Sequence, residues 1–120
     1  MKHILLIDDD PLQHELYSCY VLKSERYQII PALDVADASE ILSSQEIDLI
    51  LLDSLIPPYP DFTETVAQIR EKGYRKDIVV VAADIEKDVF KKHNDYTVKT
   101  CWDKQHISMH NFSDMLDMVA

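Results

Sequence analysis

The sequence predicts an α/β domain in which helices cover both faces of a parallel sheet. Short runs of large apolar residues recur at 4–7, 49–52 and 78–81. Segments with helical periodicity separate these runs, so that strand and helix alternate five times along the chain. Strands buried on both faces appear as continuous apolar runs, and parallel strands need crossover connections of this kind. The alternation therefore favours a single domain with a parallel sheet.

The first predicted strand covers His3–Ile7, and three aspartates follow it. Asp10 then precedes Pro11, a pair typical of a helix N-terminus. We expect His14 on the solvent side of this helix. The residues that recur at helical spacing, and that we expect to face the core, are Leu12, Leu16, Cys19 and Tyr20.

The second and third strands differ in character. The second covers Tyr27–Leu33 and contains Pro31, which cannot donate to a ladder, so we expect an edge strand. Either Asp34 or Asp37 begins the next helix. The third strand is the most apolar run of the chain and ends at Asp53; it is too short to span a membrane.

The second half of the chain continues the alternation. Asp61 is suited to cap a helix that buries Phe62, Val66 and Ile69, and Gly73 is a stop signal at its end. The further elements that we expect are a fourth strand at Ile78–Ala83, a short helix at 86–92, a fifth strand at Tyr96–Val98 with Lys99 at its exit, and a last helix at 108–119.

Composition excludes several classes of function. The 120 residues carry a formal net charge of -10, which argues against direct nucleic-acid binding because phosphate contacts need clustered cations. No apolar stretch reaches the roughly 18 residues of a membrane span, and the N-terminus lacks a signal-peptide pattern. We therefore expect a cytoplasmic protein without membrane contact. The single glycine excludes a glycine-rich phosphate loop.

Charged side chains follow several of the predicted strands. Asp8 and Asp9 follow the first, Asp53 ends the third, and Lys99 follows the fifth. The carboxyl ends of parallel strands share one edge of the sheet, where open α/β sheets bind ligands. Three carboxylates there repel one another, and Mg²⁺ relieves this repulsion while leaving room for phosphate oxygens. A carboxylate can then act as the nucleophile toward a phosphoryl group.

These features together resemble the receiver domains of two-component response regulators. The matching stretches are 4–10, 48–57, 78–83 and 95–99, and the resemblance extends over essentially the whole chain, 1–120. It implies a flavodoxin-like (βα)5 fold, a doubly wound parallel sheet with strand order 2-1-3-4-5.

The resemblance also implies roles. Asp53 is similar to the phospho-acceptor, which takes its phosphoryl group from a histidine kinase or phosphotransfer protein. Such a domain is not an enzyme in the usual sense; it relays a signal to a downstream protein or an attached output domain. Asp8, Asp9, Asp53 and the backbone carbonyl of Leu55 resemble the Mg²⁺ ligands, Lys99 the lysine that pairs with the phosphoryl group, and Tyr96 the rotating aromatic of the fifth strand.

The chain departs from the family pattern at several places. The family has Thr or Ser at the end of the fourth strand, where this chain has Ala82, or Ala83 if the alignment shifts by one. Thr100 follows Lys99 where the family has proline, and the stretch between Ala83 and Lys99 is short, which predicts a truncated fourth helix. The alternative is a pseudo-receiver that binds partners without phosphorylation. A phosphohydrolase would need an acid–base carboxylate at Leu55.

Overall fold

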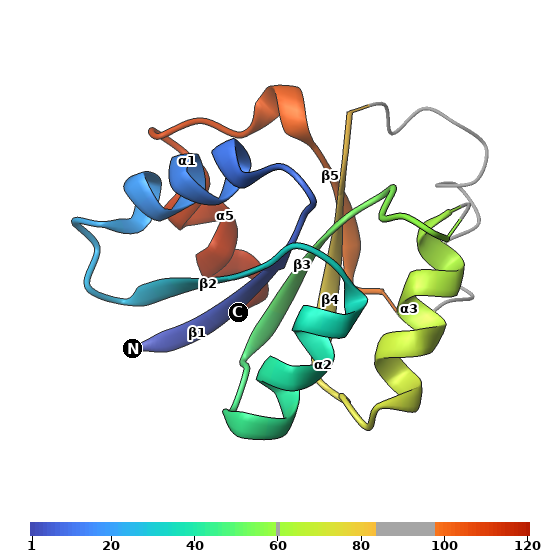
Figure 1. Cartoon of the computed structure of the whole chain (residues 1–120). Coiled ribbons are helices and arrows are strands. Elements are labelled where there is room, and N and C mark those ends of the chain that lie inside the picture. The colour runs from blue at the N-terminus through green and yellow to red at the C-terminus, as the bar shows by residue number, and fades with distance from the viewer. Residues whose placement is uncertain (60, 84–97) are drawn as a thin grey trace.

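The computed structural model describes residues 1–59, 61–83 and 98–120. They form one parallel sheet in the order β2-β1-β3-β4-β5 (Figure 1). The predicted fold class and strand order are thereby confirmed. The strands are β1 (Lys2–Ile7), β2 (Tyr27–Ala32), β3 (Leu49–Asp53), β4 (Asp77–Ala82) and β5 (Thr100–Asp103).

Helices lie on both faces of this sheet. In Figure 1, α1 (Pro11–Val21) and α5 (Phe112–Val119) cover one face, and α2 (Val35–Ser44) and α3 (Phe62–Glu71) cover the other. A short 3₁₀ helix, η2 (Lys104–His106), follows β5 directly. The helix expected at 86–92 lies outside the described residues. Within the described ranges, no helix is both long and apolar enough to cross a membrane.

The neighbouring strands β1 and β3 contribute side chains to the core on both faces of the sheet. Leu5 and Leu52 pack toward α2 and α3, whereas Leu6 and Leu51 pack toward α1 and α5, and all four are almost completely buried. Burying one such side chain contributes roughly 1.5–3 kcal/mol, and a slip of one residue would turn every side chain to the wrong layer. The register is therefore strongly fixed, and it sets Ile7 opposite Leu52 at the carboxyl edge.

Aspartates begin three of the helices. The Asp10 carboxylate accepts a bond from the Leu12 amide at 3.0 Å, and Asp61 accepts one from Thr63 at 2.9 Å. Asp34, rather than Asp37, caps α2. Each such cap contributes about 1 kcal/mol to helix stability. Pro31 lies in β2 at the edge of the sheet, as predicted.

Helix α1 buries a set of residues that differs from the predicted one: of the four side chains expected to face the core, Tyr20 alone packs against it. Leu12 is 72% exposed, and Leu16 and Cys19 are exposed as well. The buried residues are His14, Tyr17 and Val21, so the expectation that His14 faces solvent is wrong. The reason is aromatic packing: the Tyr17 ring stacks on Phe112 of α5 with centroids 4.7 Å apart. A buried aromatic ring removes more surface from water than a leucine does.

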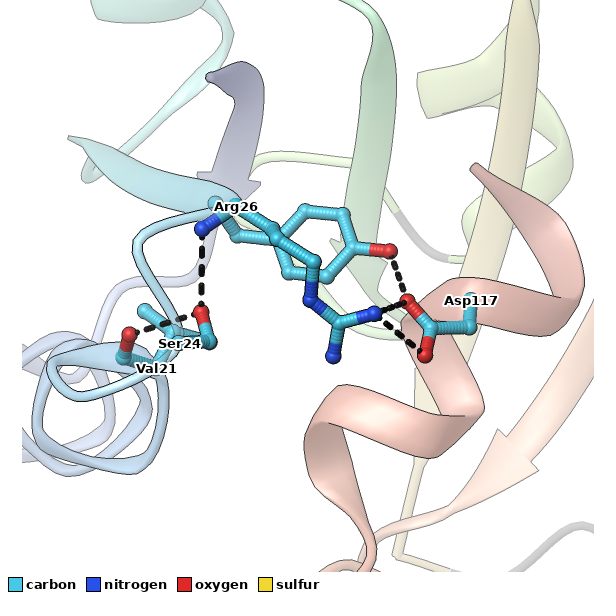
Figure 2. Close-up of polar contacts among 5 residues, drawn as sticks. Val21, Ser24, Arg26 and Asp117 are labelled. Carbon is cyan, nitrogen blue, oxygen red and sulfur yellow. Dashed lines mark hydrogen bonds and ion pairs between the residues drawn. The ribbon is translucent and has the colours of Figure 1, made fainter.

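A polar cluster ties the end of α5 to the start of β2. Figure 2 shows Arg26 reaching Asp117, with Ser24 beside it in the preceding turn. Nη1 of Arg26 lies 2.8 Å from both carboxylate oxygens of Asp117, and the Tyr27 hydroxyl donates to the same carboxylate. These contacts join residues about ninety positions apart in sequence and hold α5 against the sheet.

Candidate functional site

Three carboxylates gather at the carboxyl edge of the sheet. Asp8, Asp9 and Asp53 each place one oxygen within 4.8 Å of the others. Asp8 is only 2% exposed, the Asp53 side chain is 13% exposed, and Asp9 faces solvent. The pairing of β1 with β3 brings them together, because Asp8 follows Ile7 and Asp53 follows Leu52 in that register. The structure therefore places all three predicted acidic residues at one site.

Asp8 is held by its surroundings. Its amide donates to the Ala32 carbonyl of β2 at 3.0 Å, and its Oδ1 accepts a bond from the Asp10 amide at 2.9 Å. Carboxylates that accept backbone N–H bonds are stabilised in the charged form and cannot rotate freely. One acidic side chain of the site is thus fixed in direction before any ligand arrives.

The electrostatics of Asp53 reflect its burial. Desolvation raises the pKa of its carboxyl group, and the negative charges of Asp8 and Asp9 raise it further. The hydrogen bond and the charge of Lys104 act in the opposite direction but do not cancel the rise. The surroundings therefore destabilise the ionised form of Asp53, and a cation at this place would stabilise that form.

Lys104 is the cation of the site. Its Nζ lies 3.0 Å from Oδ1 of Asp53 and 3.4 Å from Oδ2 of Asp8. Burial alone would lower the pKa of Lys104, but the hydrogen bond to Asp53 and the charges of Asp53 and Asp8 raise it overall. The ammonium thus bridges two carboxylates that would otherwise repel each other.

The prediction of Lys99 as this lysine is wrong. Lys99 is exposed and precedes β5, and its amide donates to the Ile78 carbonyl near the start of β4 at 2.7 Å. It therefore lies near the amino ends of the strands, whereas Asp53 lies at their carboxyl ends. The physical reason is the position of β5, which covers Thr100–Asp103, so that Lys104 is the residue at its exit.

The sequence reasoning missed Lys104 because β5 gives a weak signal. All four of its residues are only half-buried, and the run Thr-Cys-Trp-Asp contains no continuous apolar stretch. A β-branched and an aromatic residue just before a lysine were the signal that was available. Tyr96, the predicted rotating aromatic, lies outside the described residues. Trp102 is the aromatic of β5 and pairs with Val81.

Two other predicted positions border the site. Ala82 ends β4, is buried, and pairs with Asp103 of β5. Leu55 lies two residues past Asp53 in the segment leaving β3, with an exposed side chain. The same segment is tied to β4, because the Ser54 amide donates to the Val81 carbonyl at 3.0 Å. The exits of β3, β4 and β5 thus converge on one small area.

The donor set suits a hard divalent cation. Mg²⁺ favours a few carboxylate oxygens together with water and phosphate oxygens over a complete protein cage. The cluster offers three carboxylate oxygens with one open, solvent-facing side at Asp9. A softer metal would prefer imidazole or thiolate ligands, and the cluster that could hold a metal ion among the described residues contains neither.

A protein-family model described as the response regulator receiver domain matches residues 4–116. The chain belongs to this family. Receiver domains are signalling modules and not classical enzymes, so the acidic site is that of a two-component signalling protein. The alternation of strands, the order of the sheet and the three carboxylates agree with this membership.

Two curated relatives and one solved structure are similar to this chain. Transcriptional regulatory protein MalR of Bacillus subtilis is 33% identical over 93 residues, which are 77% of this chain and 39% of that protein. Probable C4-dicarboxylate response regulator DctR of Priestia megaterium is 31% identical over 86 residues, 69% of this chain and 37% of that protein. This receiver therefore spans less than two fifths of the relatives that it matches.

The solved structure is that of TrrA from Thermotoga maritima, in complex with Mg²⁺ and BeF. It is 23% identical, has a TM-score of 0.78, and is covered completely, as is this chain. At this identity the likeness shows the fold alone.

The corrected lysine changes two of the departures from the family pattern. The residue after Lys104 is Gln105, so proline is still absent from that position. The stretch between β4 and the lysine gains residues 99–103, and the fourth helix that we expect to be truncated falls outside the described residues. The missing proline and the missing hydroxyl at Ala82 are both departures that stand.

Proposed function

We propose that this receiver is a phospho-acceptor in which Asp53 takes a phosphoryl group from a phosphohistidine of a histidine kinase or phosphotransfer protein. The observation that carries the proposal is the contact of Asp53 with Lys104 at 3.0 Å beside two further carboxylates. A buried nucleophile with an ammonium and a cation-binding pair at hand is suited to phosphoryl transfer.

The residues of the site divide the work. One Asp53 oxygen attacks phosphorus; the P–O bond forms as the P–N bond breaks, and its electron pair returns to the donor's ring nitrogen. Lys104 then leaves its bridge and donates to a phosphoryl oxygen. Asp8, Asp9, Asp53 and the backbone carbonyl of Leu55 would hold Mg²⁺, which when bound offsets negative charge on the transferring group.

Formal charge explains why a metal is needed. Three carboxylates carry three negative charges, and Lys104 offsets one of them. A divalent cation brings the sum to zero, so an incoming phosphoryl group meets a neutral site with two positive groups directed at it. Without the cation, the same group would approach an excess of negative charge.

The signal then passes to a partner. We infer that the receiver acts on a downstream protein or an attached output domain, in the cytoplasm, without contacting nucleic acid itself. The relatives named as a transcriptional regulatory protein and as a response regulator support an output of this kind. The net charge of -10 opposes direct contact with phosphate backbones.

Adduct formation tests the proposal. Incubation with Mg²⁺ and a small phosphodonor should add one phosphoryl group to the wild type, as measured by intact mass. Asp53→Ala should remain unmodified, whereas Asp48→Asn, which changes an aspartate next to the other end of β3, should be modified normally. A wild type without adduct, with the donor active on a known receiver, would refute the proposal.

The buried Ala82 favours one alternative, a pseudo-receiver whose partner binding ignores phosphorylation. A methyl group cannot donate to a phosphoryl oxygen, so the side chain that ends β4 cannot form a hydrogen bond that depends on the modification. In that case the affinity for a partner would be equal with and without beryllofluoride. A difference of tenfold or more would exclude it.

A further inference from the structure

His14 is a buried polar side chain of α1 that contacts the backbone of the acidic site. It lies on α1, is 7% exposed, and its Nε2 is 2.7 Å from the backbone carbonyl oxygen of Asp8. A carbonyl oxygen can only accept, so Nε2 carries a proton and donates it. The contact spans the turn from β1 to α1, which is the segment that carries Asp8 and Asp9.

The position of this carbonyl gives the contact its importance. It belongs to the peptide unit that joins Asp8 to Asp9, and that unit is planar. Because the Asp8 amide is bonded to the Ala32 carbonyl at 3.0 Å, the bond from His14 fixes the other side of the same residue. The two peptide units that flank Asp8 are therefore held from different elements: β2 holds the unit before it, and His14 of α1 holds the unit that leads on to Asp9.

The other ring nitrogen of His14, Nδ1, forms no hydrogen bond to the described residues. This nitrogen is also buried. An unpaired buried polar atom costs about 1–3 kcal/mol, so an apolar side chain would fill this space more favourably. The imidazole is thus explained by what Nε2 does and not by packing.

We propose that His14 is a positioning residue of the metal site: its Nε2–H holds the Asp8–Asp9 peptide in the orientation in which both carboxylates reach one cation. The inference rests on the proposed function, because it assigns a role toward the metal of that site. Groups that orient metal ligands typically change metal affinity by 10–100-fold when they are removed.

A purely structural role makes a different prediction. If the bond only fastens α1 to β1, its loss lowers the stability of the fold and leaves the Mg²⁺ affinity of the folded molecules unchanged. Tyr74 offers a matched control, since its buried hydroxyl donates to the Asp77 carbonyl at 3.1 Å at the opposite edge of the sheet. Tyr74→Phe removes a comparable bond between side chain and backbone, far from the carboxylates.

Calorimetric titration with MgCl₂, without any phosphodonor, separates the two roles. His14→Phe should raise the Mg²⁺ dissociation constant about tenfold or more. His14→Gln, whose amide N–H can also donate, should restore it to within about threefold, and Tyr74→Phe should leave it at the wild-type value. A wild-type dissociation constant in His14→Phe, measured on folded protein, overturns the inference.

A measurement on the wild type covers the case in which His14→Phe does not fold. In ¹⁵N-labelled protein, the Nε2–H of His14 should be protected from exchange, and its resonance should shift at Mg²⁺ saturation while those of the exposed His106 and His110 do not. If the His14 resonance does not shift at Mg²⁺ saturation, the inference about His14 is overturned and the proposed function is not affected. Failure of the wild type to bind Mg²⁺ refutes the proposed function, and this inference with it.

Discussion

At the scale of single residues, the lysine is the position at which sequence and structure disagree most. Asp8, Asp9 and Asp53 could be predicted because each follows a continuous apolar run, and such runs are demanded by strands buried on both faces. The lysine could not, because β5 is half-exposed on every residue and its burial leaves no apolar pattern. Core strands dictate sequence strongly, and edge strands do so weakly.

The two lysines can be compared directly. Lys104→Gln should slow phosphorylation of Asp53 by about 100-fold, the usual cost of removing one donor to a developing oxyanion. Lys99→Gln should stay within about twofold of the wild type, since Lys99 is exposed and distant from the carboxylates. The rate of mass increase with a small phosphodonor is the readout. The reverse order of effects would restore Lys99 to the site.

The raised pKa of Asp53 predicts a gain in stability when its charge is removed. A carboxyl group whose pKa is higher in the folded state destabilises that state as pH rises through its ordinary value of 3.8 and up to the raised value. Asp53→Asn should therefore have a larger free energy of unfolding than the wild type at pH 7 in EDTA, by roughly 0.5–2 kcal/mol, and hence a higher melting temperature. The advantage should shrink as the pH approaches 3.8. A lower melting temperature for Asp53→Asn at pH 7 would contradict this sign.

At the scale of elements, α1 shows how periodicity can select the wrong face. Leu12 and Leu16 stand at helical spacing, and so do His14 and Tyr17 beside them. Hydrophobicity alone favours the leucines, but the aromatic ring has Phe112 of α5 to stack on and the imidazole has a carbonyl to bind. Which face is buried is decided by partners on other elements, which the spacing within a helix does not reveal.

Substitutions on the two faces of α1 should differ sharply. Leu12→Ser should change the free energy of unfolding by about 0.5 kcal/mol or less, because the side chain is already in water. Tyr17→Ala should cost about 3–5 kcal/mol, because it removes a buried ring and leaves a cavity. Urea unfolding at neutral pH measures both. Comparable losses would mean that the face predicted from sequence is the buried one.

The cluster of Arg26, Tyr27 and Asp117 should behave as one unit that holds α5. Hydrogen bonds from Tyr27 and Arg26 lower the pKa of Asp117, so the contribution of the cluster is present near neutral pH and is lost as pH falls through that lowered value. Tyr27→Phe and Asp117→Ala should each lower the urea midpoint, and the double variant should lower it by less than their sum. Strict additivity would show that the contact contributes nothing.

At the scale of the whole molecule, the architecture could be predicted from the sequence because the apolar runs of the chain correspond to the buried strands. Each continuous apolar run is one strand, each aspartate cap begins one helix, and right-handed crossovers leave few arrangements for such a chain. What lay beyond the sequence were the relations between elements: the exact start of β5, the late start of α5 at Phe112, and the face of α1. Those depend on contacts between distant segments.

We expect Ala82 to weaken the coupling between phosphorylation and the rest of the molecule. This residue ends β4 beside the site and pairs with Asp103, while the neighbouring Trp102 packs against the buried cluster to which α1 and α5 contribute. A hydroxyl at position 82 could donate to a phosphoryl group, a bond of roughly 1.5–3 kcal/mol. Couplings of about 1–3 kcal/mol are typical of switches, so its absence should leave the modified site poorly connected to Trp102.

Trp102 is the only tryptophan and reports this coupling through its fluorescence. Saturation with Mg²⁺ and beryllofluoride should change the emission of the wild type little and that of Ala82→Thr substantially. Ala82→Val is the matched control, because it has nearly the shape of threonine without the hydroxyl, and both variants carry the same overpacking at a buried position. If Val and Thr respond alike, packing and not the hydrogen bond connects the site to Trp102. A large response in the wild type would show that another route through the fold replaces the hydroxyl.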